Sequence, residues 1–154
     1  MHVPDLAPLR LSPFESATNV IAVGWLEPGA EYQHGEVGAD FVRKLTDLLV
    51  NPWQPVAAAG RHSCGFCRMT GGPSVFRLHG LPMSPDVPMG VSNLWLPGDG
   101  VCYVAPSLIL HYMDSHDYSP PTEFKLAVMA CPPMRSIAYL KALLKNGPPG
   151  IASI

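Results

Sequence analysis

A glycine-rich segment at residues 60–67 carries the motif H-x-C-x-x-C, formed by His62, Cys64 and Cys67. Zn²⁺ prefers thiolate sulfur and imidazole nitrogen in a tetrahedron, and a C-x-x-C turn directs two sulfur atoms to one ion. Gly65, between the two cysteines, permits the tight backbone that such a knuckle needs. The segment therefore predicts a zinc knuckle, which requires another part of the chain to complete the site.

Two histidines further along the chain, His111 and His116, lie in a segment with helical patterning. Five positions separate them, which corresponds to about 140° around an ideal helix. Both can bind one ion only if the helix is distorted near its end, and the prolines at 120 and 121 make such a distortion feasible. The expected zinc site therefore joins the 60–67 loop to this helix.

Two ligand sets fit these residues. In the first, the ligands are His62, Cys64, Cys67 and His111, and His116 caps the helix or faces a pocket. In the second, His116 is a ligand and His62 supports the site from outside. We favour the first set narrowly, because residues two apart in extended backbone share a side, as His62 and Cys64 do. Either set gives two thiolates that balance the charge of Zn²⁺, which is typical of a closed structural site.

The composition explains why a metal is needed. Of 154 residues, 47% are apolar but only 14% are charged, against a typical charged fraction of roughly 25%. Eighteen prolines and fourteen glycines indicate much ordered loop, which is costly to order without a staple. We expect one zinc-binding domain over residues 1–154, with an extended arm at 1–18 and a loose tail at 148–154.

Apolar periodicity and turn signals predict an α+β fold, with a small antiparallel sheet and about four helices. The expected strands are residues 19–25, 74–79, 92–96 and 101–104, and the last two form a hairpin. Residues 80–90 carry three prolines and are expected to form a loop. The expected helices are residues 39–50, 106–117, 122–130 and 136–145.

Charge and targeting signals exclude several classes of protein. A net charge of -2 without a basic cluster argues against nucleic-acid and anionic-membrane partners. The first residues lack the pattern of a signal peptide, and no apolar run approaches about 18 residues. We therefore expect a cytoplasmic protein. Four cysteines, two of them in C-x-x-C spacing, make a disulfide scaffold the weaker interpretation, with Cys102 and Cys131 in the core.

A structural zinc site is the favoured function, and the biochemical activity stays unknown. The first alternative is an enzyme acting on a small molecule through an open His/Cys/Cys zinc. Its general base would be His116, Asp114, Glu123 or Asp99, although the last of these lies in an expected turn. The glutamate that zinc deaminases place two residues after their histidine is absent here, and so is H-E-x-x-H.

The second alternative is a module that binds a protein or a small ligand. Trp25, Trp53, Trp95 and the proline-rich loop 80–90 would furnish its apolar surface, although tryptophans more often pack in the core. The remaining histidines, His2, His34 and His79, receive no role. The sequence does not reveal the oligomeric state.

The stretch from Tyr103 to Phe124 reads Y-x-A-P-x-L-I-x-H-Y-x-x-x-H-x-Y-x-P-P-x-x-F. Together with the H-x-C-x-x-C motif, it resembles a family of small uncharacterised bacterial proteins over residues 60–131. The resemblance implies that His111 and His116 both belong to the pattern. It implies a bacterial origin but no particular activity.

Overall fold

A computed structural model describes residues 2–56, 61–78 and 84–151. The expectations for Gly60, for His79, for residues 80–83 and for the last three residues lie outside these ranges. The elements in chain order are β1 (Val20–Ala22), α1 (Ala39–Leu49), β2 (Val75–Phe76), β3 (Val87–Pro88), β4 (Asn93–Pro97), β5 (Cys102–Pro106), α2 (Ile109–Ser115), α3 (Thr122–Ala130) and α4 (Ile137–Asn146). The expected α+β class is confirmed.

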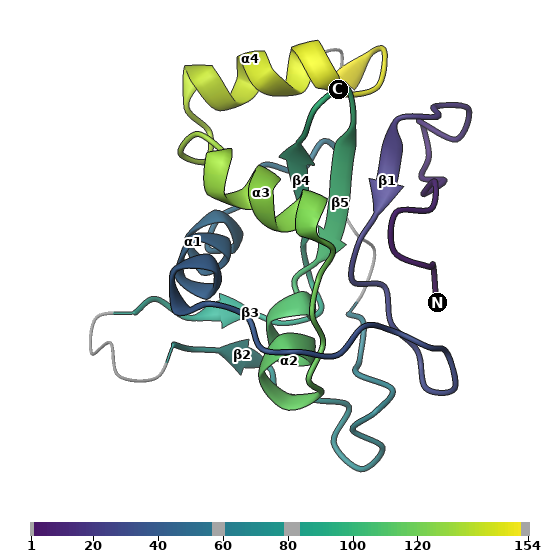
Figure 1. The fold of residues 1–154 in the computed structure, drawn as a ribbon, viewed down its shortest axis with the longest axis vertical. Helices are drawn as coiled ribbons and strands as arrows, with labels where there is room; N and C mark the ends of the chain where they lie inside the picture. Colours follow the sequence, from purple (N-terminus) through teal and green to yellow (C-terminus); the bar gives the residue numbers. More distant parts are fainter. Residues whose placement is uncertain (1, 57–60, 79–83, 152–154) are drawn as a thin grey trace.

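The central sheet has three strands in the order β1-β5-β4 (Figure 1). β4 and β5 form the expected antiparallel hairpin, in which Trp95 pairs with Val104. β1 joins the other edge of β5 in parallel, with Val20 opposite Cys102. Every residue of β4 and β5 is buried, which fits a continuous apolar run covered on both faces.

A second, two-stranded sheet pairs β2 with β3 in antiparallel fashion. The strand expected at 74–79 is therefore shorter than predicted, and its partner lies within the segment expected to be a loop. The Arg77 guanidinium and the Asp86 carboxylate, 2.6 Å apart, join the two strands. Pro88 is tolerated because each strand of a two-stranded sheet is an edge strand.

The helices are placed by their apolar faces. α1 buries Phe41, Leu45, Leu48 and Leu49 at helical spacing. It packs against α3, where the rings of Phe41 and Phe124 lie 6.4 Å apart. α4 packs against β4, and the Tyr139 hydroxyl donates to the carbonyl of a buried strand residue at 2.5 Å. No described helix is both long and apolar enough to cross a membrane.

The N-terminal arm lies along β1 and the residues that follow it. Val3 forms an isolated bridge with Trp25, and Pro8 forms one with Ile21. Leu9 and Phe14 are buried in the core, so the arm is an integral layer of the fold. At the other end, residues 148–151, in the segment predicted to be loose, include two buried residues, Pro148 and Ile151.

Candidate metal centre

Backbone hydrogen bonds close the loop that carries the two cysteines. The Cys67 amide donates to the Cys64 carbonyl at 3.3 Å, which forms the tight turn of the C-x-x-C motif. The Cys64 amide donates to the Gly71 carbonyl at 2.6 Å, and the Gly71 amide donates to the Cys67 carbonyl at 2.7 Å. Gly71 has a φ of 73°, a conformation that glycine adopts without strain. The turn therefore presents both thiols on one side of the loop.

The two histidines come from α2 and from the residue that ends it. His111 lies within the helix, and its side chain is 5% exposed. His116 is the C-cap, with a non-helical φ of -126°, and Asp117 follows with a φ of 56°. Because the chain leaves the helix at His116, the separation of about 140° expected for a continuous helix does not apply. Both imidazoles can therefore turn toward the same point.

Four side chains converge there: Cys64, Cys67, His111 and His116. The Nε2 atoms of the histidines lie 3.3 Å apart, and Cys67 Sγ lies 3.3 Å from His111 Nε2. Cys64 Sγ and Cys67 Sγ each lie 3.5 Å from His116 Nε2. All four donor atoms lie within 4.8 Å of one another. The four side chains form a group that can hold a metal ion.

These separations can be compared with a tetrahedral zinc site. Zn–S bonds of about 2.3 Å and Zn–N bonds of about 2.0–2.1 Å place sulfur and nitrogen about 3.5 Å apart and the two nitrogens about 3.3 Å apart. Three sulfur–nitrogen pairs in the structure are 3.3–3.5 Å apart, and the two nitrogens are 3.3 Å apart. These four separations therefore match edges of a Cys₂His₂ zinc tetrahedron, and the whole donor set lies within 4.8 Å.

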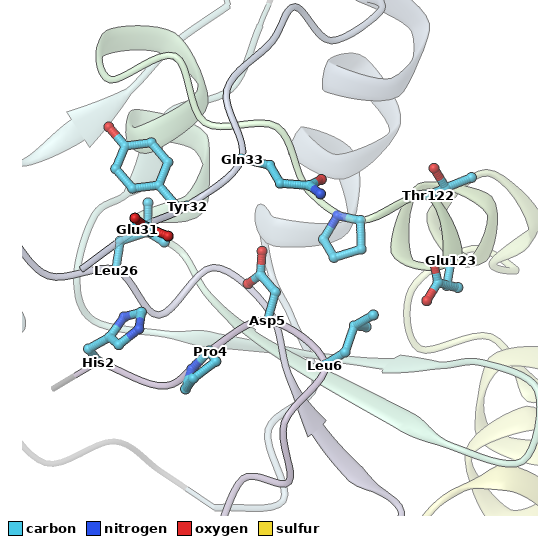
Figure 2. Close-up of a pocket in the computed structure, with 11 residues that line it drawn as sticks. His2, Pro4, Asp5, Leu6, Leu26, Glu31, Tyr32, Gln33, Thr122 and Glu123 are labelled. Atoms are coloured by element: carbon cyan, nitrogen blue, oxygen red, sulfur yellow. The ribbon is translucent and has the colours of Figure 1, made fainter.

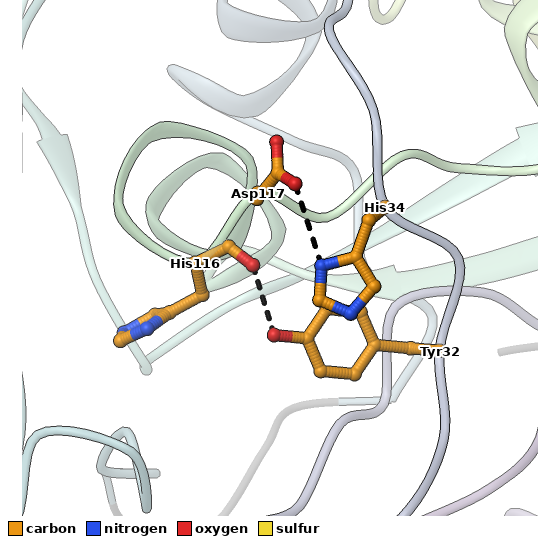
Figure 3. Close-up of polar contacts among 4 residues, drawn as sticks. All are labelled: Tyr32, His34, His116 and Asp117. Carbon is orange, nitrogen blue, oxygen red and sulfur yellow. Dashed lines mark hydrogen bonds and ion pairs between the residues drawn. The ribbon is translucent and has the colours of Figure 1, made fainter.

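The segment before α1 holds His116 in place (Figure 3). The Tyr32 hydroxyl donates to the His116 carbonyl at 2.9 Å, and His34 Nδ1 lies 3.4 Å from an Asp117 carboxylate oxygen. The Gly35 amide donates to the Asp117 carbonyl at 3.1 Å. No sequence motif predicted these contacts. The only local signal is that Tyr32 and His34 are two residues apart, so in extended backbone their rings lie on one side, where they stack with centres 4.3 Å apart.

Two further residues shape the wall of the site. Phe66, inside the C-x-x-C turn, lies over the His116 ring with the ring centres 4.9 Å apart. Gly72 has a φ of 92°, and a Cβ there would lie 3.0 Å from Cys64 Cβ and 3.5 Å from His111 Nε2. The loop can close against the site only because this position lacks a side chain.

Burial sets the protonation of the donor atoms in the metal-free protein. Burial lowers the pKa of His111, and the neighbouring His116 lowers it further. Burial also lowers the pKa of His116. Both imidazoles are therefore neutral near pH 7, with a lone pair available for a cation. Burial raises the pKa of Cys64, and the nearby Cys67 adds to this, so a cation is needed to hold Cys64 as a thiolate.

His62, the histidine favoured from extended-backbone geometry, lies outside the group of four. Its amide donates to the Gly90 carbonyl at 2.7 Å, and its exposed ring meets Trp25 edge to face with the ring centres 6.4 Å apart. This hydrogen bond to Gly90 fixes the backbone just before Cys64. The His62 side chain and the Cys64 thiol therefore point in different directions. His116, the alternative ligand, belongs to the group in which His62 was expected.

The other candidates also lie away from the group. Cys102 and Cys131 are buried free cysteines, as expected for core residues. Asp99, Asp114 and Glu123 are exposed, and none belongs to the described metal-binding group. The tryptophans considered for a binding surface are packed inside: Trp25 and Trp95 are buried, and Trp53 is half-buried.

Two hollows are lined by residues next to the loop and helix of the group or by the segment that braces it. One encloses about 500 Å³ between the arm, the segment before α1 and the start of α3, with carboxylates of Asp5, Glu31 and Glu123 around it (Figure 2). The Asp5 carboxylate is already occupied, because it accepts from the Gly24 amide at 2.9 Å and from the Tyr118 hydroxyl at 2.7 Å. The other, beside His62 and Tyr112, holds about 50 Å³, which is room for a few waters.

Comparison with known proteins places the chain in a family. The match is to the family described as Domain of unknown function (DUF7919), over residues 1–129. No curated protein and no solved structure matches the chain. The matched range contains the cysteine loop, all of α2 and His116. Since the match covers well over half of the sequence, the protein belongs to the DUF7919 family.

Proposed function

We propose that this protein is a zinc-binding domain in which Zn²⁺ joins the 61–72 loop to α2. The ligands are Cys64, Cys67, His111 and His116. The observation that carries the proposal is the convergence of two Sγ and two Nε2 atoms within 4.8 Å, with four of their separations matching edges of a zinc tetrahedron. The whole of residues 1–154 then acts as one domain around this staple.

The donor set favours zinc over other cations. Two sulfur and two nitrogen donors without carboxylate exclude Mg²⁺ and Ca²⁺, which prefer oxygen ligands. Two thiolates neutralise the charge of Zn²⁺, and four protein ligands leave no open position for a substrate. These features support a structural role over the alternative of an open three-ligand enzyme site. Free thiol ligands also fit the reducing cytoplasm expected from the sequence, in a bacterial cell as the motif resemblance implies.

Metal content tests the proposal. Protein purified without added metal should hold one equivalent of zinc by elemental analysis. Replacing zinc with Co²⁺ should give the visible spectrum of a tetrahedral S₂N₂ site. Less than about half an equivalent of any metal would overturn the proposal.

Histidine variants separate the two ligand sets. We expect His116→Ala to lose most of the metal, since it removes one of four ligands, whereas His62→Ala should retain a full equivalent. Cys102→Ser is the matched control for Cys64→Ser, because it removes a buried thiol that lies outside the group. Full metal in His116→Ala together with loss of metal in His62→Ala would show that the ligand set containing His62 is right.

A further inference from the structure

A groove beside α2 is lined by none of the four side chains of the metal-binding group. It encloses about 570 Å³ and is bounded by residues 35–37, α1, β2 and α2, and we call it the α1–α2 groove. In Figure 1, α1 lies above the β2–β3 pair, with α2 beside them. This volume falls within the range of about 300–1,000 Å³ typical of small-molecule sites. The groove is therefore large enough for an organic molecule.

The floor of the groove is apolar. Phe76 and Leu110 are buried, and Met113 is half-buried. Val37 and Val42 complete the floor and are half-buried as well. These side chains come from the segment before α1, from α1, from β2 and from α2, so the apolar surface is contiguous across four parts of the fold. A ligand that fills the groove would bury an apolar body against them.

The rim of the groove is mostly acidic. Glu36, Asp114 and Asp117 line it with carboxylates, and Arg43 is the only cation among the described lining residues. All four are exposed, so their charges act on a ligand at the mouth of the groove. Three negative charges against one positive charge favour a cation there.

We propose that the α1–α2 groove binds a small amphipathic organic cation. The apolar body of the ligand lies on the floor formed by Phe76, Leu110 and Met113. Its ammonium group lies at the rim, between the carboxylates of Glu36 and Asp114. This assigns to the protein a second site that is separate from the metal group. Residues of α2 contribute to both sites.

The probe is dansylcadaverine, which joins an apolar fluorescent body to a primary ammonium group through a short chain. Its matched control carries a carboxylate on a linker of similar length. Binding transfers the dansyl group from water to the apolar floor, which raises its emission and shifts it to shorter wavelength. We expect saturable binding of the ammonium probe, at least about ten-fold tighter than that of the carboxylate probe.

Met113→Arg tests the location, because it places a bulky cation on the floor. We expect it to weaken the ammonium probe by at least about ten-fold. Met129→Arg makes the same chemical change on an exposed position of α3 outside the groove and should leave binding unchanged. Asp114→Asn should weaken the ammonium probe alone, and Arg43→Gln should strengthen it.

The proposal is overturned if Met113→Arg and Met129→Arg bind alike, if probes of both charges bind equally, or if no saturable binding occurs. Zinc content and thermal unfolding are measured for every variant. A variant that keeps its metal and its fold but no longer binds the probe tests the groove proposal alone. A protein that contains no zinc contradicts the metal proposal but not the groove proposal.

Discussion

The cysteine loop and the β4–β5 hairpin reach order by different means. Every residue of the two strands is buried, and the hairpin is held by ladder hydrogen bonds and apolar packing. Among residues 61–72, Cys64 is the one buried side chain, and Met69 is 97% exposed. A loop with so little apolar burial does not offset the entropy of ordering its backbone. The hairpin is ordered by its own packing, whereas we expect the loop to depend on the proposed metal.

Metal removal should have the largest effect, and it should act on the loop and not on the hairpin. We expect strong chelation to expose amides of residues 61–72 and 109–118 to hydrogen exchange, while those of β4 and β5 stay protected. The loss of stability should be several kcal/mol, below the value of about 10–16 kcal/mol known for zinc-finger peptides, because this chain has a core of its own. Hydrogen exchange followed by mass spectrometry measures both regions at once. Equal loss of protection in the loop and in the hairpin would refute the comparison.

A core substitution should act in the opposite way. Leu96→Ala removes a fully buried side chain from β4 and should lower the free energy of unfolding by about 2–5 kcal/mol. The metal should remain at one equivalent, because Leu96 lies outside the metal-binding group. Denaturant unfolding and elemental analysis of the same sample give both quantities. Loss of metal in this variant would show that the two regions do not behave independently.

A pair of glycine substitutions sharpens the comparison at the site wall. Gly72 and Gly29 have nearly equal backbone angles, with φ of 92° and 91°, but a Cβ would meet Cys64 at Gly72 and open space at Gly29. Both alanine variants should lose about 1–2 kcal/mol to the left-handed backbone. Gly72→Ala should in addition weaken zinc affinity by about ten-fold or more. A competition titration with a chromophoric chelator measures this, and equal zinc affinities would contradict it.

The smallest expected effect is on the pH dependence of the metal-free protein. Burial lowers the pKa values of His111 and His116 below the ordinary value of about 6.5, so the unfolded chain binds more protons at acid pH. Stability should therefore fall as the pH drops through about 6.5. Burial raises the pKa of Cys64, so stability should also fall as the pH rises above about 8.5.

Urea midpoints at about pH 5.5, 7.5 and 9.5 would show a maximum at the middle value. A midpoint that rises steadily toward either end would contradict the assigned directions. The His111→Gln variant is the control, because it should reduce the acid-side loss without changing the alkaline side.

Most of the helices and the β4–β5 hairpin were predictable because their signals are local. Phe41, Leu45 and Leu48 recur at helical spacing, and the turn after Pro97 contains two glycines. Two features were not predictable. β1 lies parallel to β5 through contacts distant in sequence. β3 lies where the proline content predicted a loop, and Pro88 is itself a strand residue.

The site was predictable as a pairing of the C-x-x-C loop with the histidine-bearing helix. The presence of His116 rather than His62 in the described group was not predictable, because it depends on where α2 ends. That end is fixed by Tyr32, which holds the His116 carbonyl, and by the positive φ of Asp117. Helical spacing carries no information about a residue that has already left the helix.

The parallel pairing of β1 with β5 has a consequence for synthesis. Val20 finds its strand partner at Cys102, about 80 residues later, so at roughly 5–20 residues per second it waits about 4–16 s on the ribosome. Val20 and Ala22 are apolar side chains that become buried only when that partner arrives. β1 therefore reaches its native place only after β5 has been made, and during that interval its apolar side chains are open to capture by a chaperone.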